Sequence, residues 1–171
     1  TKKGKLDTHI FFFFFYNENG VLARVVELFS GRGYNIESLA EAEVDATKNI
    51  SRITIVTTGT PQVIDQIKLQ LKKLVPVHKV ADFKREDKKV IFKEMALIKV
   101  VGNKKKIEKT LKACKSFNPV ILDKTQQSVV IQITALRREI DKMSKKLKPL
   151  GLVSTSRTGA IAMTRGAEVF K

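Results

Sequence analysis

The chain of 171 residues has one cysteine, two histidines and no tryptophan. The single cysteine, Cys114, cannot form an internal disulfide bond. His9 and His78 stand alone, with no second ligand at the spacing of a zinc site. No Ser-His-Asp, Cys-His or paired-carboxylate grouping suggests a catalytic site, and no apolar run approaches the ~20 residues of a membrane span. We therefore assign no catalytic or metal-binding residue, and these absences favour a regulatory role.

Secretory features are also missing from the start of the sequence. Residues 1–5 are basic, but no small-residue cleavage site of a signal peptide follows them. Together with the unpaired cysteine, this predicts a reducing, cytoplasmic location. The hydrophobic fraction of 43% is ordinary for a globular protein, so the chain can bury a core.

Acidic residues are scarce in the second half of the chain. Residues 81–171 hold 22 Lys and Arg against 9 Asp and Glu, a net charge of +13, whereas residues 1–80 hold 11 against 8, a net charge of +3. Such an excess suits nucleic acid, a solvated lysine surface or an acidic protein partner. The excess is mostly lysine, and few tyrosines and no tryptophan are available to stack on bases, which argues against nucleic acid. The other two interpretations stay open.

The first half of the sequence alternates between strand and helix patterns. Residues 10–16 form a continuous apolar run, typical of a strand covered on both faces. An apolar stripe at helical spacing follows, made up of Leu22, Val25, Val26 and Phe29. Glycines at positions 31 and 33 suit the end of this helix, because glycine tolerates a left-handed backbone.

Two further strands, a helix and a last strand complete this half. Residues 35–44 and 50–58 read as strands around a polar turn, and Pro61 lies at the first turn of a helix. Pro76 is expected to stop that helix before a strand at 77–83. The order is β-α-β-β-α-β, which is the ferredoxin-like arrangement.

A second copy of the same order follows a charged run at 84–89, which reads as an interdomain linker. We expect strands within 90–101, at 120–122, at 128–134 and within 152–163, and helices over 104–116 and around Leu136 to Leu147. The predicted fold class is α+β, with two tandem ferredoxin-like βαββαβ domains. Their predicted boundaries are 1–83 and 90–171.

The turn between the first strand and the first helix carries the strongest functional signal. Asn17, Asn19 and Gly20 join the two elements, and Asn35 lies in the turn after the helix. Free backbone N–H groups at a helix start attract a carboxylate, and asparagine side chains add donors and acceptors without charge. This chemistry suits a small zwitterion, although an ordinary helix cap at Asn19 would use the same residue types.

Residues 17–39 closely resemble the N-terminal ACT domain of the regulatory small subunits of acetohydroxyacid synthase, also called acetolactate synthase. The likeness continues in shorter motifs, which are residues 51–54, 70–75, 94–100, 157–160 and 164–166. It therefore covers nearly the whole chain, and it implies that both domains are of the ACT type. The five phenylalanines at 11–15 depart from the family, whose first strand is usually aliphatic. Their far side needs cover from the second domain or another protomer.

The resemblance implies a site for valine at a homodimer interface. The positions that match the family's binding motifs are Asn17, Gly20, Val21, Leu22, Asn35 and Ile36. By this resemblance Gly20 lets the ligand carboxylate approach the backbone, and Asn35 faces it from the other protomer. Val21, Leu22 and Ile36 are expected to hold the branched side chain. Valine, leucine and isoleucine differ too little for the sequence to rank them.

The resemblance also implies a regulatory chain without its own active site or cofactor. Its partner is expected to be a separate catalytic subunit that holds thiamine diphosphate, Mg²⁺ and FAD. The present chain is expected to stimulate that subunit and to make it sensitive to valine. Two alternatives come from other classes, namely a free-standing ACT-domain sensor that acts on nucleic acid through its basic half, and a structural partner that binds no ligand.

Overall fold

The computed structural model describes residues 4–74 and 77–167, so the expected helix stop at Pro76 lies outside the described residues. The contacts divide the chain into two compact units. The first takes in the described residues up to Ile91 and those from Ala162 onward, and the second takes in Phe92–Ile161.

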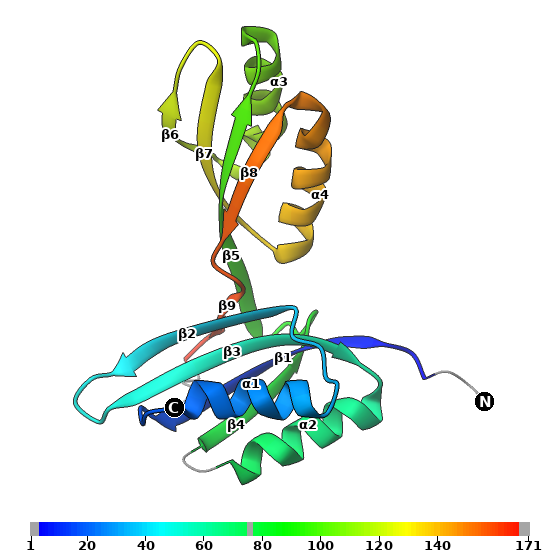
Figure 1. Cartoon of the computed structure of the whole chain (residues 1–171), viewed down its shortest axis with the longest axis vertical. Helices are drawn as coiled ribbons and strands as arrows, with labels where there is room; N and C mark the ends of the chain where they lie inside the picture. The colour runs from blue at the N-terminus through cyan, green and yellow to red at the C-terminus, as the bar shows by residue number, and fades with distance from the viewer. Residues whose placement is uncertain (1–3, 75–76, 168–171) are drawn as a thin grey trace. The chain divides into compact units, whose positions relative to one another are not determined.

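The first unit has the predicted βαββαβ order. Its elements are β1 (Asp7–Tyr16), α1 (Val21–Gly31), β2 (Ser38–Asp45), β3 (Ile50–Gly59), α2 (Pro61–Lys73) and β4 (Val77–Lys84) (Figure 1). The strands lie in the order β2-β3-β1-β4, and every neighbouring pair is antiparallel. This order makes β2 and β4 the edge strands.

The core of the first unit lies between the sheet and its two helices. Alternate residues of β1, namely Phe11, Phe13 and Phe15, are fully or almost fully buried in this core. Thr60 caps α2 by accepting a hydrogen bond from the Val63 N–H, and proline follows at the first helical position. The expected helix is therefore present with the expected start.

The other face of β1 is buried as well. Phe12 and Phe14 are only 3% and 7% exposed. The Phe12 ring packs against Phe83 of β4 with a centroid separation of 5.5 Å, and the guanidinium of Arg52 lies 5.9 Å from the Phe12 ring centroid. The five phenylalanines are thus core residues on both sides of the sheet.

The second unit repeats the same topology. Its elements are most of β5 (Val90–Val101), then α3 (Lys104–Cys114), a 3-10 turn (Lys115–Phe117), β6 (Val120–Lys124), β7 (Ser128–Ala135), α4 (Arg137–Leu147), a second 3-10 turn (Lys148–Leu150) and β8 (Leu152–Arg157) (Figure 1). The strand order β6-β7-β5-β8 matches that of the first unit. The α+β class with two ferredoxin-like sheets is therefore confirmed.

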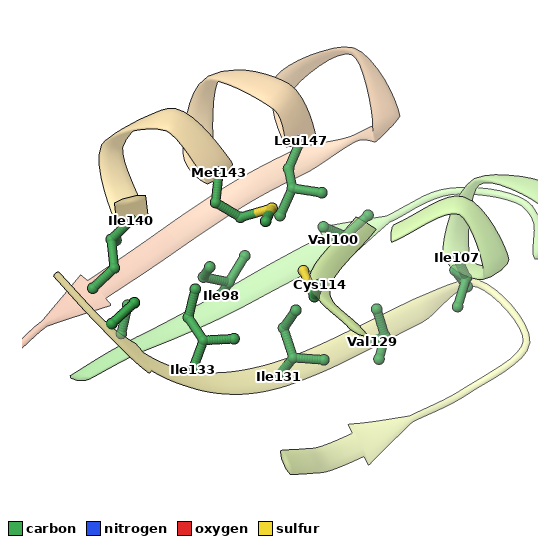
Figure 2. Packing of buried hydrophobic residues seen from close by; sticks show 12 residues of the cluster. Ile98, Val100, Ile107, Cys114, Val129, Ile131, Ile133, Ile140, Met143 and Leu147 are labelled. Carbon is green, nitrogen blue, oxygen red and sulfur yellow. The ribbon is translucent and has the colours of Figure 1, made fainter. Parts of the chain in front are cut away.

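Strand β5 shows why this sheet has one covered face. Its residues alternate between buried and exposed along the whole strand, as expected when helices cover one side only. Figure 2 shows Ile140, Met143 and Leu147 of α4 above the aliphatic side chains of the strands, with Cys114 among them. Cys114 is fully buried and lies on the apolar face of α3.

A buried ion-pair network joins three elements of the second unit. The Glu94 carboxylate on β5 is 0% exposed. Arg157 of β8 donates two hydrogen bonds to this carboxylate, from Nε at 2.8 Å and from Nη2 at 3.0 Å. Arg157 also bonds Asp141 of α4, and Arg137 lies 3.7 Å from Glu94. The hydrogen bonds that Arg157 donates to Glu94 and then to Asp141 raise the pKa of Arg157 further above its ordinary value, so it stays charged.

The end of the chain differs from the sequence-based division. The last strand, β9 (Ile161–Thr164), pairs with β5, and the Arg165 N–H donates to the Lys89 carbonyl at 2.8 Å. This pairing groups the residues from Ala162 onward with the first unit, although the sequence placed them in the second domain. Residues 84–89 form a turn, in which the Asp87 N–H donates to the Lys84 carbonyl. The boundaries 1–83, 84–89 and 90–171 stay a prediction. In the part of the chain that the structure describes, no helix is long and apolar enough to cross a membrane.

Candidate ligand-binding site

The turn between β1 and α1 is docked onto the hairpin between β2 and β3. The Asn17 N–H donates to the Asn49 carbonyl at 2.8 Å, and the Asn49 side-chain amide donates back to the Asn17 carbonyl at 3.1 Å. These bonds use only the backbone of Asn17. Its side chain is exposed and makes no hydrogen bond within residues 4–74 and 77–167. The turn is therefore held in place by backbone hydrogen bonds, and the Asn17 side-chain amide stays available to a ligand.

The hairpin that supports this turn is itself braced. The Asp45 carboxylate accepts hydrogen bonds from the Thr47 hydroxyl at 2.6 Å and from the Lys48 N–H at 3.1 Å. The Thr47 bond and then the Lys48 bond lower the pKa of Asp45, because they favour its charged form. Asn49 follows with a left-handed backbone at φ 53°, a conformation that asparagine tolerates.

Gly20 caps α1 with a left-handed backbone at φ 82° and makes no side-chain cap. The first helical hydrogen bond runs from the Arg24 N–H to the Gly20 carbonyl at 3.0 Å. The N–H groups of Leu22 and Ala23 therefore have no partner inside the helix, as at every helix start. A Cβ on Gly20 would meet nothing within 4 Å, so the backbone angle, and not crowding, favours glycine here.

The predicted apolar stripe of α1 is wrong at two positions. The residues that face the core are Val21, Val25 and Phe29, whereas Leu22 and Val26 are 37% and 42% exposed. The buried residues follow the spacing i, i+4 and i+8 from Val21, and the next residue along at each turn falls outside this face. The Val21 side chain thus points into the core and not to the surface. Leu22 and Val26 lie one turn apart on the solvent side.

The segment after α1 is anchored to β3. The Thr57 hydroxyl donates to the Asn35 carbonyl at 2.5 Å, and the Glu37 N–H donates to the Val56 carbonyl at 2.9 Å. The Thr58 hydroxyl donates to the Glu37 carboxylate at 2.5 Å. Between these anchors the Asn35 side chain is exposed and forms no hydrogen bond in the described chain. Ile36 is half-buried and packs against the core.

The two parts of the predicted site lie at opposite ends of one sheet. Thr57, which holds Asn35, pairs with His9 near the start of β1, whereas the turn at Asn17 follows Tyr16 at its end. Seven residue steps separate His9 from Tyr16, a span of about 23 Å at ~3.3 Å per residue. One protomer therefore does not bring Asn35 to Asn17 and Gly20.

Sequence reasoning missed several residues that shape these two surfaces. Thr57 and Thr58 look like ordinary strand residues, and nothing in their pattern signals a bond to a distant loop. Asn49 could have been suspected, since asparagine often adopts the left-handed backbone of turns. The exposure of Val26 could not be predicted from its residue type, because it is as apolar as the buried Val25 beside it.

Metal binding finds no support in the described residues. Among them no group of three or more His, Cys, Asp or Glu side chains lies close enough to hold a metal ion. His9, which stood alone in the sequence, pairs through Nδ1 with the Asp82 carboxylate at 2.6 Å. Lys68 lies 3.6 Å from the same carboxylate, so Asp82 of β4 links β1 to α2.

Family models match both halves of the chain. Residues 13–79 match the ACT domain of acetohydroxyacid synthase small subunits, and residues 93–166 match a model described as the small subunit of acetolactate synthase. Together these matches extend over most of the chain, including both parts of the candidate site.

Individual relatives agree with these models. The acetolactate synthase small subunit of Aquifex aeolicus is 36% identical over 96% of this chain and 84% of its own length. That of Mycobacterium bovis is 33% identical over 93% of each chain. The crystal structure of the acetolactate synthase small subunit from Thermotoga maritima superimposes with a TM-score of 0.81 at 31% identity, over 94% of this chain and 99% of that one. With the fold and these matches along nearly its whole length, the chain belongs to the acetolactate synthase small-subunit family.

Proposed function

We propose that this chain is the regulatory subunit of an acetolactate synthase, that it stimulates a separate catalytic subunit, and that it makes that subunit sensitive to inhibition by valine. Family membership supports the regulatory role. The observation that carries the ligand proposal is that the backbones of Asn17 and Asn35 are both held by hydrogen bonds. Each has its backbone carbonyl hydrogen-bonded and its side-chain amide exposed and uncommitted. Such groups bind a zwitterion without having to break internal bonds first.

A homodimer can bring the two asparagines together. Strand β2 lies at the edge of its sheet, with Ser38 beside Val56 and Asp45 beside Ile50. Antiparallel pairing of two copies of β2 about a two-fold axis places the Ser38 end of one copy beside the Asp45 end of the other. Asn35 precedes Ser38, and the Asn17 turn is bonded to the hairpin that follows Asp45.

This pairing generates two equivalent sites per dimer, because a two-fold interface repeats each contact. In each site the helix start after Gly20 offers N–H groups to the valine carboxylate, and Asn35 of the other copy offers an amide to the ammonium or carboxylate group. The exposed Leu22 lies beside that helix start and suits the branched side chain. Ile36 approaches from the other copy.

Inhibition then follows from linkage. Valine that bridges two chains binds only the paired arrangement and stabilises it. The catalytic subunit is inhibited only to the extent that it binds the valine-bound and free arrangements with different affinity. Thiamine diphosphate, Mg²⁺ and FAD belong, in this proposal, to the catalytic subunit.

The basic half of the chain suits an acidic protein partner better than nucleic acid. No lysine of α3 or α4 forms a salt bridge within the described residues, so these charges are available for long-range attraction. Neither tryptophan nor tyrosine occurs from residue 81 onward to stack on bases. A random DNA duplex should therefore show no tight retardation in a gel shift at physiological salt.

Calorimetric titration of the full chain with L-valine, L-leucine and L-isoleucine tests the ligand. We expect saturable binding of valine and a tighter dimer in sedimentation at low protein concentration when valine is present. Binding of none of the three would remove the effector from the proposal. Binding without any shift of the monomer–dimer balance would argue that the site lies within one chain.

A further inference from the structure

We propose that Thr57 is a positioning residue for the ligand site, acting through the backbone of Asn35. The inference rests on the proposed function, because it concerns the same site. Thr57 is 0% exposed and lies within β3, so it cannot touch a ligand at the surface. Its hydroxyl nevertheless donates to the Asn35 carbonyl at 2.5 Å, and Asn35 is the exposed residue of that segment.

The surrounding contacts make this hydrogen bond the local anchor. The segment from Tyr34 to Glu37 has no regular secondary structure. Tyr34 is tied to the end of α1 through its N–H, and Glu37 is tied to Val56 and Thr58. Ile36 packs against the core, and within residues 4–74 and 77–167 the Asn35 carbonyl is held by the hydrogen bond from Thr57. Without it the carbonyl can turn to solvent, and the backbone from which the Asn35 side chain projects is no longer fixed at this point.

A fixed backbone matters because ordering a mobile loop segment on binding costs free energy. Thr57 meets that requirement from the interior of the sheet, where its own position is fixed by pairing with His9 and by full burial. The neighbouring Thr58 acts on Glu37 instead and is hydrogen-bonded to Thr8 at 2.8 Å. The two threonines thus have separate tasks along one segment.

The test variant is Thr57→Val, which replaces the hydroxyl by a methyl group of similar size and keeps a residue that suits a strand. We expect the valine dissociation constant to rise about tenfold, the effect of one lost hydrogen bond of ~1.4 kcal/mol. Thr57→Ser restores the hydroxyl and should bind within about twofold of the unaltered chain. Thr54→Val is the matched control, because Thr54 lies on the same strand, is 3% exposed and has no bond to the Asn35 segment.

Hydrogen exchange of residues 34–37 gives a readout that does not depend on valine. Exchange there should be faster in Thr57→Val and unchanged in Thr57→Ser and Thr54→Val. Faster exchange with unchanged valine affinity would overturn the inference and leave the proposed function intact. Equal affinity loss in Thr54→Val would also overturn it, since the effect would then be a general one of the strand. If the unaltered chain binds no valine, the proposed effector fails and this inference fails with it.

Discussion

Gly20 combines a backbone requirement with a place in the proposed site, and two substitutions separate them. Its φ of 82° strains any residue with a side chain, although a Cβ there meets nothing within 4 Å. Asparagine tolerates this conformation better than other side chains. Gly20→Asp adds a negative charge beside the expected ligand carboxylate, whereas Gly20→Asn has nearly the same size without the charge.

We therefore expect Gly20→Asp to abolish valine binding and Gly20→Asn to retain most of it. Two like charges about 4 Å apart cost ~4 kcal/mol at an effective dielectric near 20, which is a loss of several hundredfold or more. Calorimetry with valine provides the measurement. Equal binding by both variants would show that the ligand carboxylate does not lie at Gly20.

Cys114 offers a second prediction for a single side chain. Burial raises the pKa of this thiol to about 11 from an ordinary value of 9.0, because the charged thiolate loses its hydration. At pH 8 the folded chain therefore holds almost no thiolate, and the sulfur is also inaccessible. A thiol reagent should react slowly with the native chain and at once after unfolding. Rapid reaction of the native chain would contradict the buried position.

The helices and strands followed the sequence patterns closely wherever an apolar period was strong. The β-α-β-β-α-β order of both halves could be predicted, because alternation and helical spacing reflect burial directly. The predicted strand at 35–44 instead begins at Ser38, since the Asn35 carbonyl accepts a hydrogen bond from the Thr57 side chain and not from the backbone of β3. Such a side-chain contact has no periodic signature.

The candidate site could be predicted only in part for a related reason. The glycines of the two turns, Gly20 and Gly33, could be predicted as turn residues, because few other residues adopt the left-handed backbone that both have. The inward direction of Val21 depended on the first residue of α1, which patterns locate to within a few residues only. The separation of Asn35 from Gly20 became clear only from the register of β1 and β3.

The ion-pair network between β5, β8 and α4 gives a prediction about these elements. Arg157→Met leaves the fully buried Glu94 with Arg137 at 3.7 Å as its remaining partner in the described network. Removing one partner of a buried pair typically costs about 3–5 kcal/mol, and the remaining arginine places the expected loss near the lower end. Amides of β5 and β8 should exchange correspondingly faster.

A matched control comes from an exposed pair. Lys48 lies 3.9 Å from Asp45, and its side chain is 72% exposed. Lys48→Met should change stability by less than ~1 kcal/mol, since exposed ion pairs contribute little. If Arg157→Met has an equally small effect on chemical denaturation, the Glu94 network does not hold the second unit together.

The charge of the whole chain bears on how it meets its partner. A net charge of +16 should speed association with an acidic surface and make the rate fall with added salt, because exposed charges are screened beyond ~8–10 Å at 0.1–0.15 M ionic strength. Valine binding within the small-subunit dimer should depend on salt much less. The two reactions are therefore separable in one preparation.

In the proposed function, this chain confers valine sensitivity on a catalytic subunit through the site around Gly20. The direct measurement is the rate of acetolactate formation by a purified catalytic subunit, alone and with the full chain, over a range of valine concentrations. We predict stimulation by the unaltered chain and by Gly20→Asp, and inhibition by valine with the unaltered chain only. If valine inhibits the enzyme with neither the unaltered chain nor Gly20→Asp, the proposed role of valine is wrong. If valine inhibits fully with Gly20→Asp, the proposed place of the site is wrong.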